Sequence, residues 1–350
     1  MSVAAPEQSL LGDYQRMQLI RVFETEAERQ YKLANIGGYC HLSIGQEALC
    51  VGSVGAMADD DLLVTGYRCH GFALARGLSP ESVMAELFGR VDGCAHGRGG
   101  SMHLLDPDRG YYGGWGIVGG QLPIATGLAL SLVRRGEKKA VLCELGDGAV
   151  NIGAFHEALN LAALWDLPVV FLVVNNRYGM GTAVHRASAE PELFRRAQAY
   201  RMIGERINGD DLDEVGDAVG SLLAQAREDG RPSMLEAITY RYRGHSVADP
   251  GTSYRTKDEI ARYREGDPIL VARERLLADG ADEAEISAVD AEIDARVGAA
   301  VEFALASSEP PLDRLAAGTY APGSAEQFAR MRPGSPFGEA ELVFEAGLGT

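Results

Sequence analysis

The chain has 350 residues, of which 46% are hydrophobic, so it is long enough to bury a sizeable core in one large or two smaller globular domains. Its 50 acidic and 33 basic residues give a formal net charge of −17, which argues against nucleic acid or an anionic membrane as the main partner. The five scattered cysteines contain no C-x-x-C pair, which gives no support to a zinc or redox site and is typical of a reducing cytosol.

No targeting segment is evident in the sequence. Residues 1–20 contain acidic side chains and lack both the apolar stretch of a secretory signal and the Arg-rich, acid-poor character of a transit peptide. No run of 18 apolar residues is present, so no membrane span is expected. A bacterial-type cytoplasmic protein is the simplest interpretation.

The first third of the chain is predicted to combine helices with one strand. Apolar residues recur every three or four positions over 10–35, which indicates a helix, and two more helices are expected at 46–57 and 80–90. Residues 60–66 are predicted to form a strand. Segment 93–121 contains ten glycines and is predicted to be largely irregular, and long irregular segments inside compact domains are usually functional.

One part of this glycine-rich segment, Gly114-Trp115-Gly116-Ile117-Val118-Gly119, matches the pattern G-x-G-x-x-G. The match alone is a weak signal for a dinucleotide site, because the fingerprint requires a strand immediately before it. Residues 110–113 make a poor strand, so we expect no nicotinamide cofactor here.

A strand–helix–strand unit is predicted in the middle of the chain, after a helix at about 122–134. Residues 140–145 and 169–174 are apolar runs of strand length, and the residues between them repeat at helical spacing. Two strands joined in this way are parallel, with a right-handed crossover. Asp147 and Asn176 directly follow the two strands, so we expect both side chains to leave the same edge of one sheet.

These two residues predict a magnesium-diphosphate site. Mg²⁺ takes hard oxygen ligands, usually one or two carboxylates completed by phosphate oxygens and water, and an Asp carboxylate with an Asn amide oxygen suits that demand. Glycines on both sides of Asp147 allow a sharp turn, and the helix opening near Asn151 would point free N–H groups at an anion. The alternative is an Asp in an ordinary strand-to-helix turn and an unrelated loop Asn.

The last third of the chain is predicted to alternate again. A helix is expected at 190–200, and a short strand and a helix follow between Ile207 and about Arg227. Residues 234–241 are predicted to form a further strand that opens into a polar loop at 244–257. Apolar residues at helical spacing then mark a C-terminal amphipathic helix, namely Ile286, Val289, Ile293, Val297 and Val301.

Together these elements predict one α/β domain over residues 1–322, with a doubly wound, mostly parallel sheet. A helical arm is expected at about 1–36 and additional helices at about 266–322. The tail at 323–350 has no clear periodicity, and we expect it to be disordered or to lie on a partner. Ligands of open parallel sheets bind beyond the carboxyl ends of the strands, where the glycine-rich and polar loops are predicted to lie.

Several long motifs resemble thiamine diphosphate enzymes, specifically the α subunit of the E1 component of 2-oxo acid dehydrogenase complexes of the pyruvate or acetoin type. The similarity extends from about Gly38 to about Leu270. It is carried by HLSIGQEA (41–48), YRCHGFALARGLSP (67–80), GCAHGRGGSMHLLD (93–106), GGWGIVGGQ (113–121), GDGAVNIGAFHEALNLAALWDLPVVFLVVNNRYGMGT (146–182) and YRYRGHSVADPGTSYRTKDEI (240–260). Trp115 and Ile152 depart from the smaller or polar residues that are usual at these two places.

The resemblance implies an activity and its partners. The chain would decarboxylate a 2-oxo acid, pyruvate before others, on thiamine diphosphate with Mg²⁺, and the acyl group would pass to a lipoyl group on a separate E2 protein. An E1 β subunit would supply the activating glutamate, which implies an α₂β₂ heterotetramer and an α chain that is inactive alone. An acetoin or branched-chain 2-oxo acid dehydrogenase is the alternative, and a non-catalytic assembly subunit is an alternative of another class.

The resemblance also implies roles for individual residues. Catalytic histidines would be His245 and His70. Cofactor contacts would come from Tyr67, Arg68, Gly116, Val118, Asp147, Gly148, Ala149, Asn176, Met180 and His245. Metal ligands would be Asp147, Asn176 and the backbone carbonyl of Tyr178, and substrate-side residues would be Tyr39 and His41. Ser246 and Ser253 match serines that are kinase targets in mitochondrial pyruvate enzymes, but here we expect them to be hydrogen-bonding loop residues.

For most of these positions the residue type alone also fits a structural role. Tyr67 and Arg68 could form surface contacts, a single histidine such as His70 or His245 is often a satisfied structural residue, and Met180 could be core packing. The motifs around them favour the functional interpretation.

Overall fold

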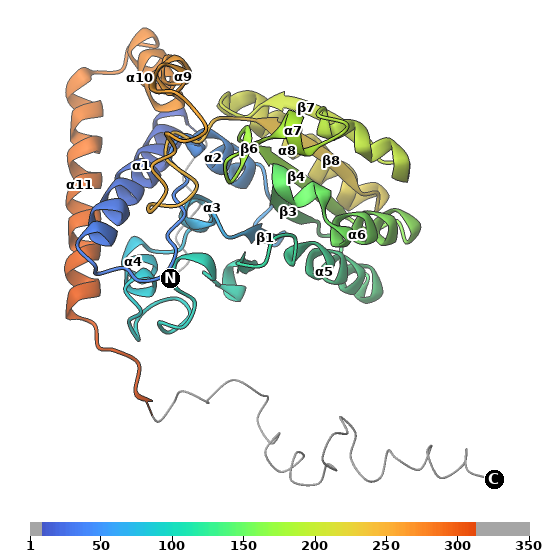
Figure 1. Ribbon diagram of the computed structural model, residues 1–350, viewed down its shortest axis with the longest axis horizontal. Coiled ribbons are helices and arrows are strands. Elements are labelled where there is room, and N and C mark those ends of the chain that lie inside the picture. The colour runs from blue at the N-terminus through green and yellow to red at the C-terminus, as the bar shows by residue number, and fades with distance from the viewer. Residues whose placement is uncertain (1–8, 313–350) are drawn as a thin grey trace. The chain divides into compact units, whose positions relative to one another are not determined.

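A six-stranded parallel sheet forms the centre of the molecule (Figure 1). The computed structural model describes residues 9–312, so the predicted tail at 323–350 and the domain boundary at 322 lie outside the described residues. The strand order is β2-β1-β3-β4-β8-β7, and every neighbouring pair is parallel. The strands are β1 (Leu62–Gly66), β2 (Tyr111–Trp115), β3 (Val141–Gly146), β4 (Val169–Asn175), β7 (Ile203–Asn208) and β8 (Ser233–Ile238). The predicted doubly wound α/β fold is confirmed.

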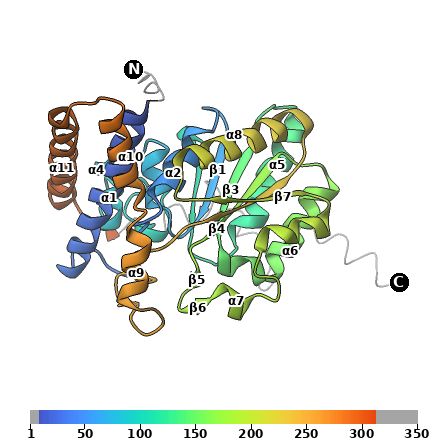
Figure 2. The ribbon, with the colours of Figure 1, turned by 90° about the horizontal axis from the view of Figure 1, so that it is seen from above.

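Helices cover both faces of this sheet (Figure 2). One face is covered by α2 (Glu47–Gly55), α3 (His70–Ala75) and α8 (Leu212–Asp229), with α1 (Leu10–Lys32), α4 (Pro80–Leu87), α10 (Pro268–Ala278) and α11 (Glu283–Ala306) packed outside them. The other face is covered by α5 (Gln121–Arg135), α6 (Gly153–Leu164) and the 3₁₀ helix Leu193–Tyr200. Two short helices lie outside these layers, α7 (Val184–Ala187) and α9 (Lys257–Arg264). A small antiparallel hairpin pairs β5 (Tyr178–Gly179) with β6 (Thr182–Ala183). Three further 3₁₀ turns are also present among the described residues.

Strands β3 and β4 are buried on both sides, which explains their nearly continuous apolar sequences. Leu142 and Leu172 belong to the core under α2 and α8, whereas Cys143 and Phe171 belong to the core under α5 and α6. Alternation of side chains along each strand therefore builds two separate cores from one sheet. Cys143 is buried in β3, within the strand that was predicted at 140–145.

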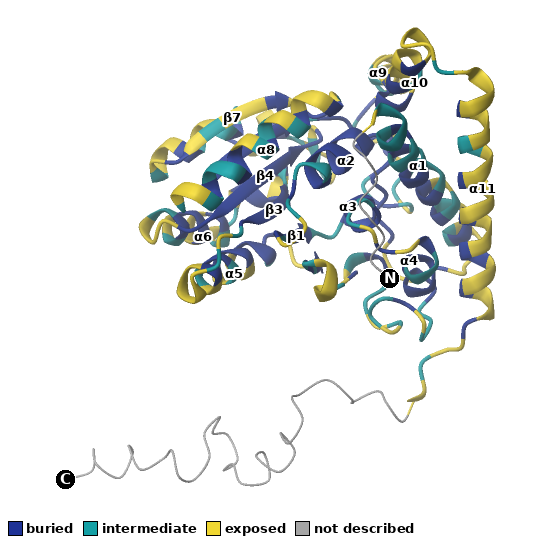
Figure 3. Cartoon of the chain, turned by 180° about the vertical axis from the view of Figure 1, so that it is seen from behind, coloured by how far each residue is buried: buried dark blue, intermediate teal, exposed yellow. Residues whose placement is uncertain are grey.

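The predicted C-terminal amphipathic helix is α11. Its apolar stripe packs against α1 and α4, and its opposite face is exposed (Figure 3). Ile286, Ile293, Val297 and Val301 are buried on that stripe. Asp282 caps the helix by accepting a hydrogen bond from the backbone N–H of Ala284. No helix among the described residues is long and apolar enough to cross a membrane.

The prediction that residues 110–113 make a poor strand was wrong. β2 begins at Tyr111 and runs through the two glycines that follow, as an edge strand paired with β1. Its register shifts between Leu63 and Thr65, and Gly113 adopts a φ of 95°, which a glycine accommodates best. Tertiary pairing therefore overrides a low local strand propensity.

A strand consequently does precede the G-x-G-x-x-G match. In the dinucleotide fold, however, the strand before the glycines lies next to the strand that follows the helix. Here β1 lies between β2 and β3, so the arrangement differs from that fold. Topology, and not the lack of a strand, is the reason to expect no nicotinamide cofactor at this segment.

Four other elements differ from prediction. The helix expected near Asn151 begins at Gly153, after a 3₁₀ turn over Asp147–Asn151. The helix expected at 190–200 is a 3₁₀ helix, and β7 begins four residues before Ile207. The strand expected at 234–241 ends at Ile238. These ends depend on pairing with neighbouring strands, which local sequence specifies poorly.

Candidate functional site

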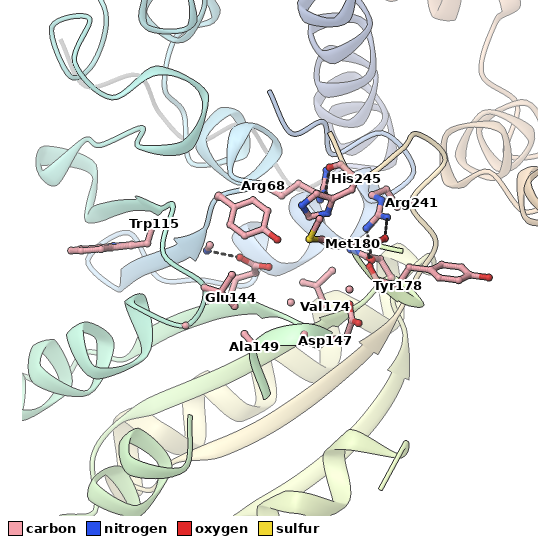
Figure 4. A pocket seen from close by; sticks show the side chains of 18 of the residues that line it. Arg68, Trp115, Glu144, Asp147, Ala149, Val174, Tyr178, Met180, Arg241 and His245 are labelled. Carbon is pink, nitrogen blue, oxygen red and sulfur yellow. Dashed lines mark hydrogen bonds between the residues drawn. The ribbon is translucent and has the colours of Figure 1, made fainter. Parts of the chain in front are cut away.

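A cavity of about 250 Å³ lies at the carboxyl ends of β1, β3 and β4 (Figure 4). This is the edge of the sheet where the predicted magnesium-diphosphate site was expected. The lining residues include most of those that the sequence singled out, namely Tyr67, Arg68, Val118, Asp147, Gly148, Ala149, Asn176, Tyr178, Met180 and His245. Gly116, His41, Tyr39 and His70 are not among them.

The expected ligand oxygens converge at this edge. β3 and β4 pair in parallel with Gly146 opposite Val174, so Asp147 and Asn176 leave adjacent strands together. The Asn176 Oδ1 and the backbone O of Tyr178 lie 3.1 and 3.0 Å from one nitrogen, the Nη1 of Arg241. A Cβ placed on Gly179 would lie 3.5 Å from the Asp147 Oδ2, so the carboxyl also faces the turn that carries Tyr178.

Arg241 is the cation that holds these oxygens in the structure. Its side chain is almost fully buried, and its Nη2 donates to the backbone O of Met180 at 3.0 Å and to the Tyr254 hydroxyl at 3.2 Å. A guanidinium bound by an amide oxygen and carbonyl oxygens shows that this oxygen set accepts positive charge. The residues present therefore fit a divalent cation that takes oxygen ligands.

Two glycines allow the two turns beside the Asp147 carboxyl to approach each other. A Cβ on Gly148 would lie 3.8 Å from the Gly179 Cα, so the backbones of the two turns face each other closely. Within residues 9–312 no group of three or more His, Cys, Asp or Glu side chains could hold a metal ion. The candidate set is instead one carboxylate, one amide oxygen and one carbonyl oxygen.

Burial changes the proton affinity of the carboxyl in this set. Asp147 is 5% exposed, and burial raises the pKa of its carboxyl to about 6, although the Arg241 guanidinium acts in the opposite direction. Asp147 is therefore ionised at neutral pH and able to bind a cation.

Arg68 provides positive charge at the other side of the cavity. Its Nη1 donates to the Leu42 carbonyl at 2.7 Å and its Nη2 to the His245 carbonyl at 2.8 Å, which fixes the guanidinium in place. Burial and the nearby Arg241 lower the pKa of Arg68 to about 10, so the side chain is still charged at neutral pH. A fixed cation of this kind suits a diphosphate.

Three aromatic rings stand beside Arg68. The ring of His41 lies 4.5 Å from that of Tyr67 and 5.1 Å from that of His245. Burial and the charge of Arg68 lower the pKa of His245 to about 4 and that of His41 to about 2, so both imidazoles are neutral at pH 7. The Nδ1 atoms of both histidines are buried and have no hydrogen-bond partner among the described residues. Such atoms are suited to bind a polar ligand atom.

The structure places His70 outside the cavity. Its ring is fully buried, with Nδ1 2.7 Å from the Glu24 carboxyl and Nε2 2.9 Å from the Ser101 hydroxyl. The Ser101 Oγ in turn accepts a hydrogen bond from the backbone N–H of His41 at 3.3 Å. His70 is thus placed to support the segment that carries His41, and it does not line the cavity.

Other predicted residues lie at the margin of the cavity. Tyr39 is 66% exposed, and its ring lies 6.3 Å from that of His41. The Met180 side chain is also 66% exposed, at a residue with a φ of 53°. Ser246 is buried, whereas Ser253 is exposed.

The loop at 244–257 is held by two side chains. The Asp249 carboxyl accepts hydrogen bonds from the backbone N–H of His245 at 2.7 Å and from the Tyr254 hydroxyl at 2.7 Å. The Arg255 guanidinium, 5% exposed, donates to the backbone carbonyls of Arg241 and Arg243. These contacts connect the loop to the end of β8 and to the cavity.

We expect cofactor binding to protect loop 244–257 from proteolysis, because Arg241 joins the ligand oxygens of the cavity to the Tyr254 hydroxyl. The measurement is limited proteolysis with and without thiamine diphosphate and Mg²⁺. Tyr254→Phe should lose most of the protection, since it lacks the hydroxyl that links Arg241 to Asp249. Equal cleavage of the unaltered protein in both conditions would contradict this expectation.

The sequence analysis did not single out Glu144, which lines the cavity. It is a charged residue inside the otherwise apolar β3, and that contrast was a usable signal. Its Oε2 accepts a hydrogen bond from the backbone N–H of Gly66 at 2.7 Å. Burial raises the pKa of this carboxyl from its usual 4.5 to about 7, against the opposing effects of the Gly66 hydrogen bond and Arg68. Arg241 was likewise missed.

We expect Glu144→Gln to stabilise the cofactor-free protein at pH 8 much more than at pH 5. The folded protein retains the Glu144 proton up to about pH 7, whereas the unfolded chain releases it near 4.5, so stability is lost as pH rises through this window. The difference corresponds to on the order of 3 kcal/mol in the free energy of unfolding. Urea unfolding of both proteins at the two pH values measures it, and an equal effect at both would refute the assignment.

Comparisons with known proteins agree with this geometry. A family model described as "Dehydrogenase E1 component" matches residues 15–313. The chain is 44% identical over 304 residues to the pyruvate dehydrogenase E1 component subunit alpha, somatic form, mitochondrial, of Homo sapiens, which covers 86% of this chain and 77% of the relative. It is 44% identical over 307 residues to the subunit alpha of Rhizobium meliloti (strain 1021), covering 87% of this chain and 88% of the relative. It is 41% identical over 310 residues to the pyruvate dehydrogenase E1 component subunit alpha of Rickettsia bellii (strain RML369-C), covering 88% of this chain and 95% of the relative.

Proposed function

Because the chain belongs to the dehydrogenase E1 component family, we propose that it is the α subunit of a pyruvate dehydrogenase-type E1. It decarboxylates pyruvate with thiamine diphosphate, and the acyl group passes to a lipoyl-bearing E2. The observation that carries the proposal is the convergence of the Asn176, Tyr178 and Asp147 oxygens at one sheet edge, across a cavity from the fixed cation Arg68. Relatives that are 41–44% identical over 86–88% of this chain are named pyruvate dehydrogenase E1 component subunit alpha.

The metal and the diphosphate would be held by different groups at this edge of the cavity. Asp147, Asn176 and the Tyr178 carbonyl would hold Mg²⁺, and Arg241 would have to give up its bonds to the last two. Arg68 and Tyr67 would bind phosphate oxygens, together with backbone N–H groups of Gly148 and Ala149 in the 3₁₀ turn.

When bound, thiamine diphosphate supplies the electron sink that allows a 2-oxo acid to lose CO₂. The chain contributes positions and protons around it. His245 and His41 are neutral at pH 7, so each can donate one hydrogen bond to an oxygen and accept another. The apolar side chains of Trp115, Ile117 and Val118 line the same cavity and would exclude water from the cofactor rings.

A β subunit completes the proposed enzyme, because the family resemblance assigns the glutamate that activates the aminopyrimidine to that subunit and we assign none of residues 9–312 to this role. We expect the purified chain alone to show no pyruvate-dependent reduction of a dye acceptor with added thiamine diphosphate and Mg²⁺. Addition of the β partner should restore it. Full activity of the chain alone would refute the shared site, and no activity of the α/β complex with any 2-oxo acid would refute the proposed function.

The substrate panel in that assay separates the remaining alternatives. Pyruvate is expected to be turned over faster than acetoin or a branched-chain 2-oxo acid, because the relatives are named for pyruvate. A non-catalytic assembly subunit is disfavoured by the presence of Asp147, Asn176, Tyr67, Arg68 and His245 around one cavity. Tight binding of NAD in calorimetry would revive the nicotinamide alternative. We also propose that the protein acts with a lipoyl-bearing E2 partner in the cytoplasm.

A further inference from the structure

Glu144 presents an acceptor group to the cavity that the proposed function leaves without a partner. The side chain is 5% exposed and lines the cavity between β1 and β4. Its neighbours along β3, Cys143 and Leu145, point into the opposite core, as alternation along a strand requires. Within residues 9–312, the hydrogen bond from Gly66 N–H is the one bond to this carboxyl.

Gln121 adds a second acceptor at the same place. Its Nε2 donates to the backbone O of Glu144 at 2.9 Å, which leaves its Oε1 buried without a hydrogen-bond partner among the described residues. A Cβ placed on Gly66 would lie 3.4 Å from the Glu144 Oε2 and 3.5 Å from the Gln121 Nε2, so the two side chains meet in front of Gly66. Buried acceptors of this kind are usually satisfied by a donor.

The charges around Glu144 do not supply that donor. Arg68 and Tyr67 follow β1, Cys50 faces it from α2, and Asp147 follows β3. Arg68 is the cation among them, and its two terminal nitrogens are bound to the carbonyls of Leu42 and His245. The carboxyl therefore has no ion-pair partner within the described part of the chain.

The cavity that the two acceptors face also has aromatic and aliphatic lining residues. Trp115, Ile117 and Val118 are among the residues that line the cavity, and Figure 4 shows the Glu144 carboxyl between Trp115 and Val174 in this view. Such walls suit a ring, whereas Arg68 and Asp147 mark the place of the charged diphosphate and its metal. The ligand group facing Glu144 must therefore belong to a ring and must carry an N–H donor or a positive charge.

We propose that Glu144 and Gln121 form an acceptor site for an electron-poor nitrogen heterocycle of the cofactor. This inference rests on the proposed function. A carboxylate in a low-dielectric cavity is stabilised by a charge-assisted hydrogen bond or by a facing cation, and a buried carboxylate without either is costly. Thiamine diphosphate offers both chemistries, an amino group on its pyrimidine ring and a positive charge on its thiazolium ring.

The test is calorimetric titration of the α/β complex at pH 8 with three ligands. They are thiamine diphosphate, an analogue with an oxo group in place of the pyrimidine amino group, and an analogue with a neutral thiazolone ring. We expect Glu144→Leu to weaken binding of thiamine diphosphate about tenfold or more. The effect should disappear with the oxo analogue if the amino group faces Glu144, or with the thiazolone analogue if the ring cation does.

Two further variants make the outcome decisive. Glu144→Gln keeps the shape of the side chain and should show the same ligand dependence if Glu144→Leu fails to fold. Asp210→Asn removes another carboxyl, partly buried, whose pKa is raised by burial to about 6 and which does not line the cavity. This variant should bind all three ligands as the unaltered protein does. Equal effects of a Glu144 variant on all three ligands, or none, would overturn the inference. Failure of the unaltered complex to bind thiamine diphosphate would instead refute the proposed function.

Discussion

Asp147→Ala is expected to abolish Mg²⁺-dependent binding of thiamine diphosphate, with a loss of roughly 100-fold or more in affinity. Asp147 is the one carboxylate of the candidate ligand set, and its side chain is buried beside Gly179 in the turn that carries Tyr178. The amide and carbonyl oxygens that remain are neutral and bind Mg²⁺ weakly by themselves. Calorimetric titration of the α/β complex with thiamine diphosphate, with Mg²⁺ present and absent, measures the effect.

The matched control for this prediction is Asp210→Asn. Burial raises the pKa of Asp210 to about 6, as it does for Asp147, but Asp210 binds the Thr239 hydroxyl at 2.5 Å and lies outside the cavity. The control should bind the cofactor normally. Retention of Mg²⁺-dependent binding by Asp147→Ala would show that the metal is held elsewhere.

Glu86→Ala is expected to lower the free energy of unfolding by about 3–5 kcal/mol, because it removes a fully buried carboxylate and leaves four partly buried backbone donors unsatisfied. Glu86, in α4, is fully buried, and its two carboxyl oxygens accept hydrogen bonds of 2.6–3.1 Å from four backbone N–H groups. The donors are Ala95, Gly97, Gly99 and Gly100. Urea unfolding measures the change.

The same substitution should also disturb the site at a distance. The segment that Glu86 holds leads directly to Ser101, whose hydroxyl lies 2.9 Å from the His70 ring and 3.3 Å from the His41 backbone nitrogen. Glu81→Ala, on the same helix but half-buried, is the control and should cost less than about 1 kcal/mol. A loss below this value for Glu86→Ala would mean that the glycine-rich segment does not depend on the carboxyl.

The sequence was sufficient for the feature on which the site depends. Strand–helix–strand connections are parallel and right-handed, so residues that end two such strands meet at one edge whatever their separation along the chain. For that reason Asp147 and Asn176 could be placed together from the apolar runs before them. This prediction depended on the lengths of the apolar runs and on the positions of Gly146 and Gly148. The parallel pairing of β3 with β4 confirms its geometric basis.

The orientation of individual side chains could not be predicted in the same way. Alternation along β3 shows that Glu144 faces away from Cys143, but the sequence does not say which face carries the cavity. His70 belongs to a long family motif, yet its ring turns toward Glu24 and Ser101 because α3 packs against α1. Arg241 follows the end of β8 and reaches the β4 edge only because β8 pairs with β4. Each depends on packing between segments that are distant in sequence.

Arg241 has a further consequence for the proposed metal site. One of its nitrogens binds two of the three oxygens that would ligate Mg²⁺, so guanidinium and metal compete for the same acceptors. Occupation by the metal would free the Nη1 of Arg241 for the diphosphate, while its Nη2 already donates to Tyr254 of loop 244–257. This exchange explains how one buried cation can satisfy the oxygens before a ligand binds.

The most direct measurement is a crystal structure of the α/β complex with thiamine diphosphate and Mg²⁺. Octahedral Mg²⁺ holds its ligands at about 2.1 Å. We expect the Asp147 carboxyl, the Asn176 Oδ1 and the Tyr178 carbonyl at that distance from the metal. The Arg241 guanidinium should no longer bind Asn176 and Tyr178. A metal bound to the diphosphate while Arg241 still donates to Asn176 and Tyr178 would contradict the account.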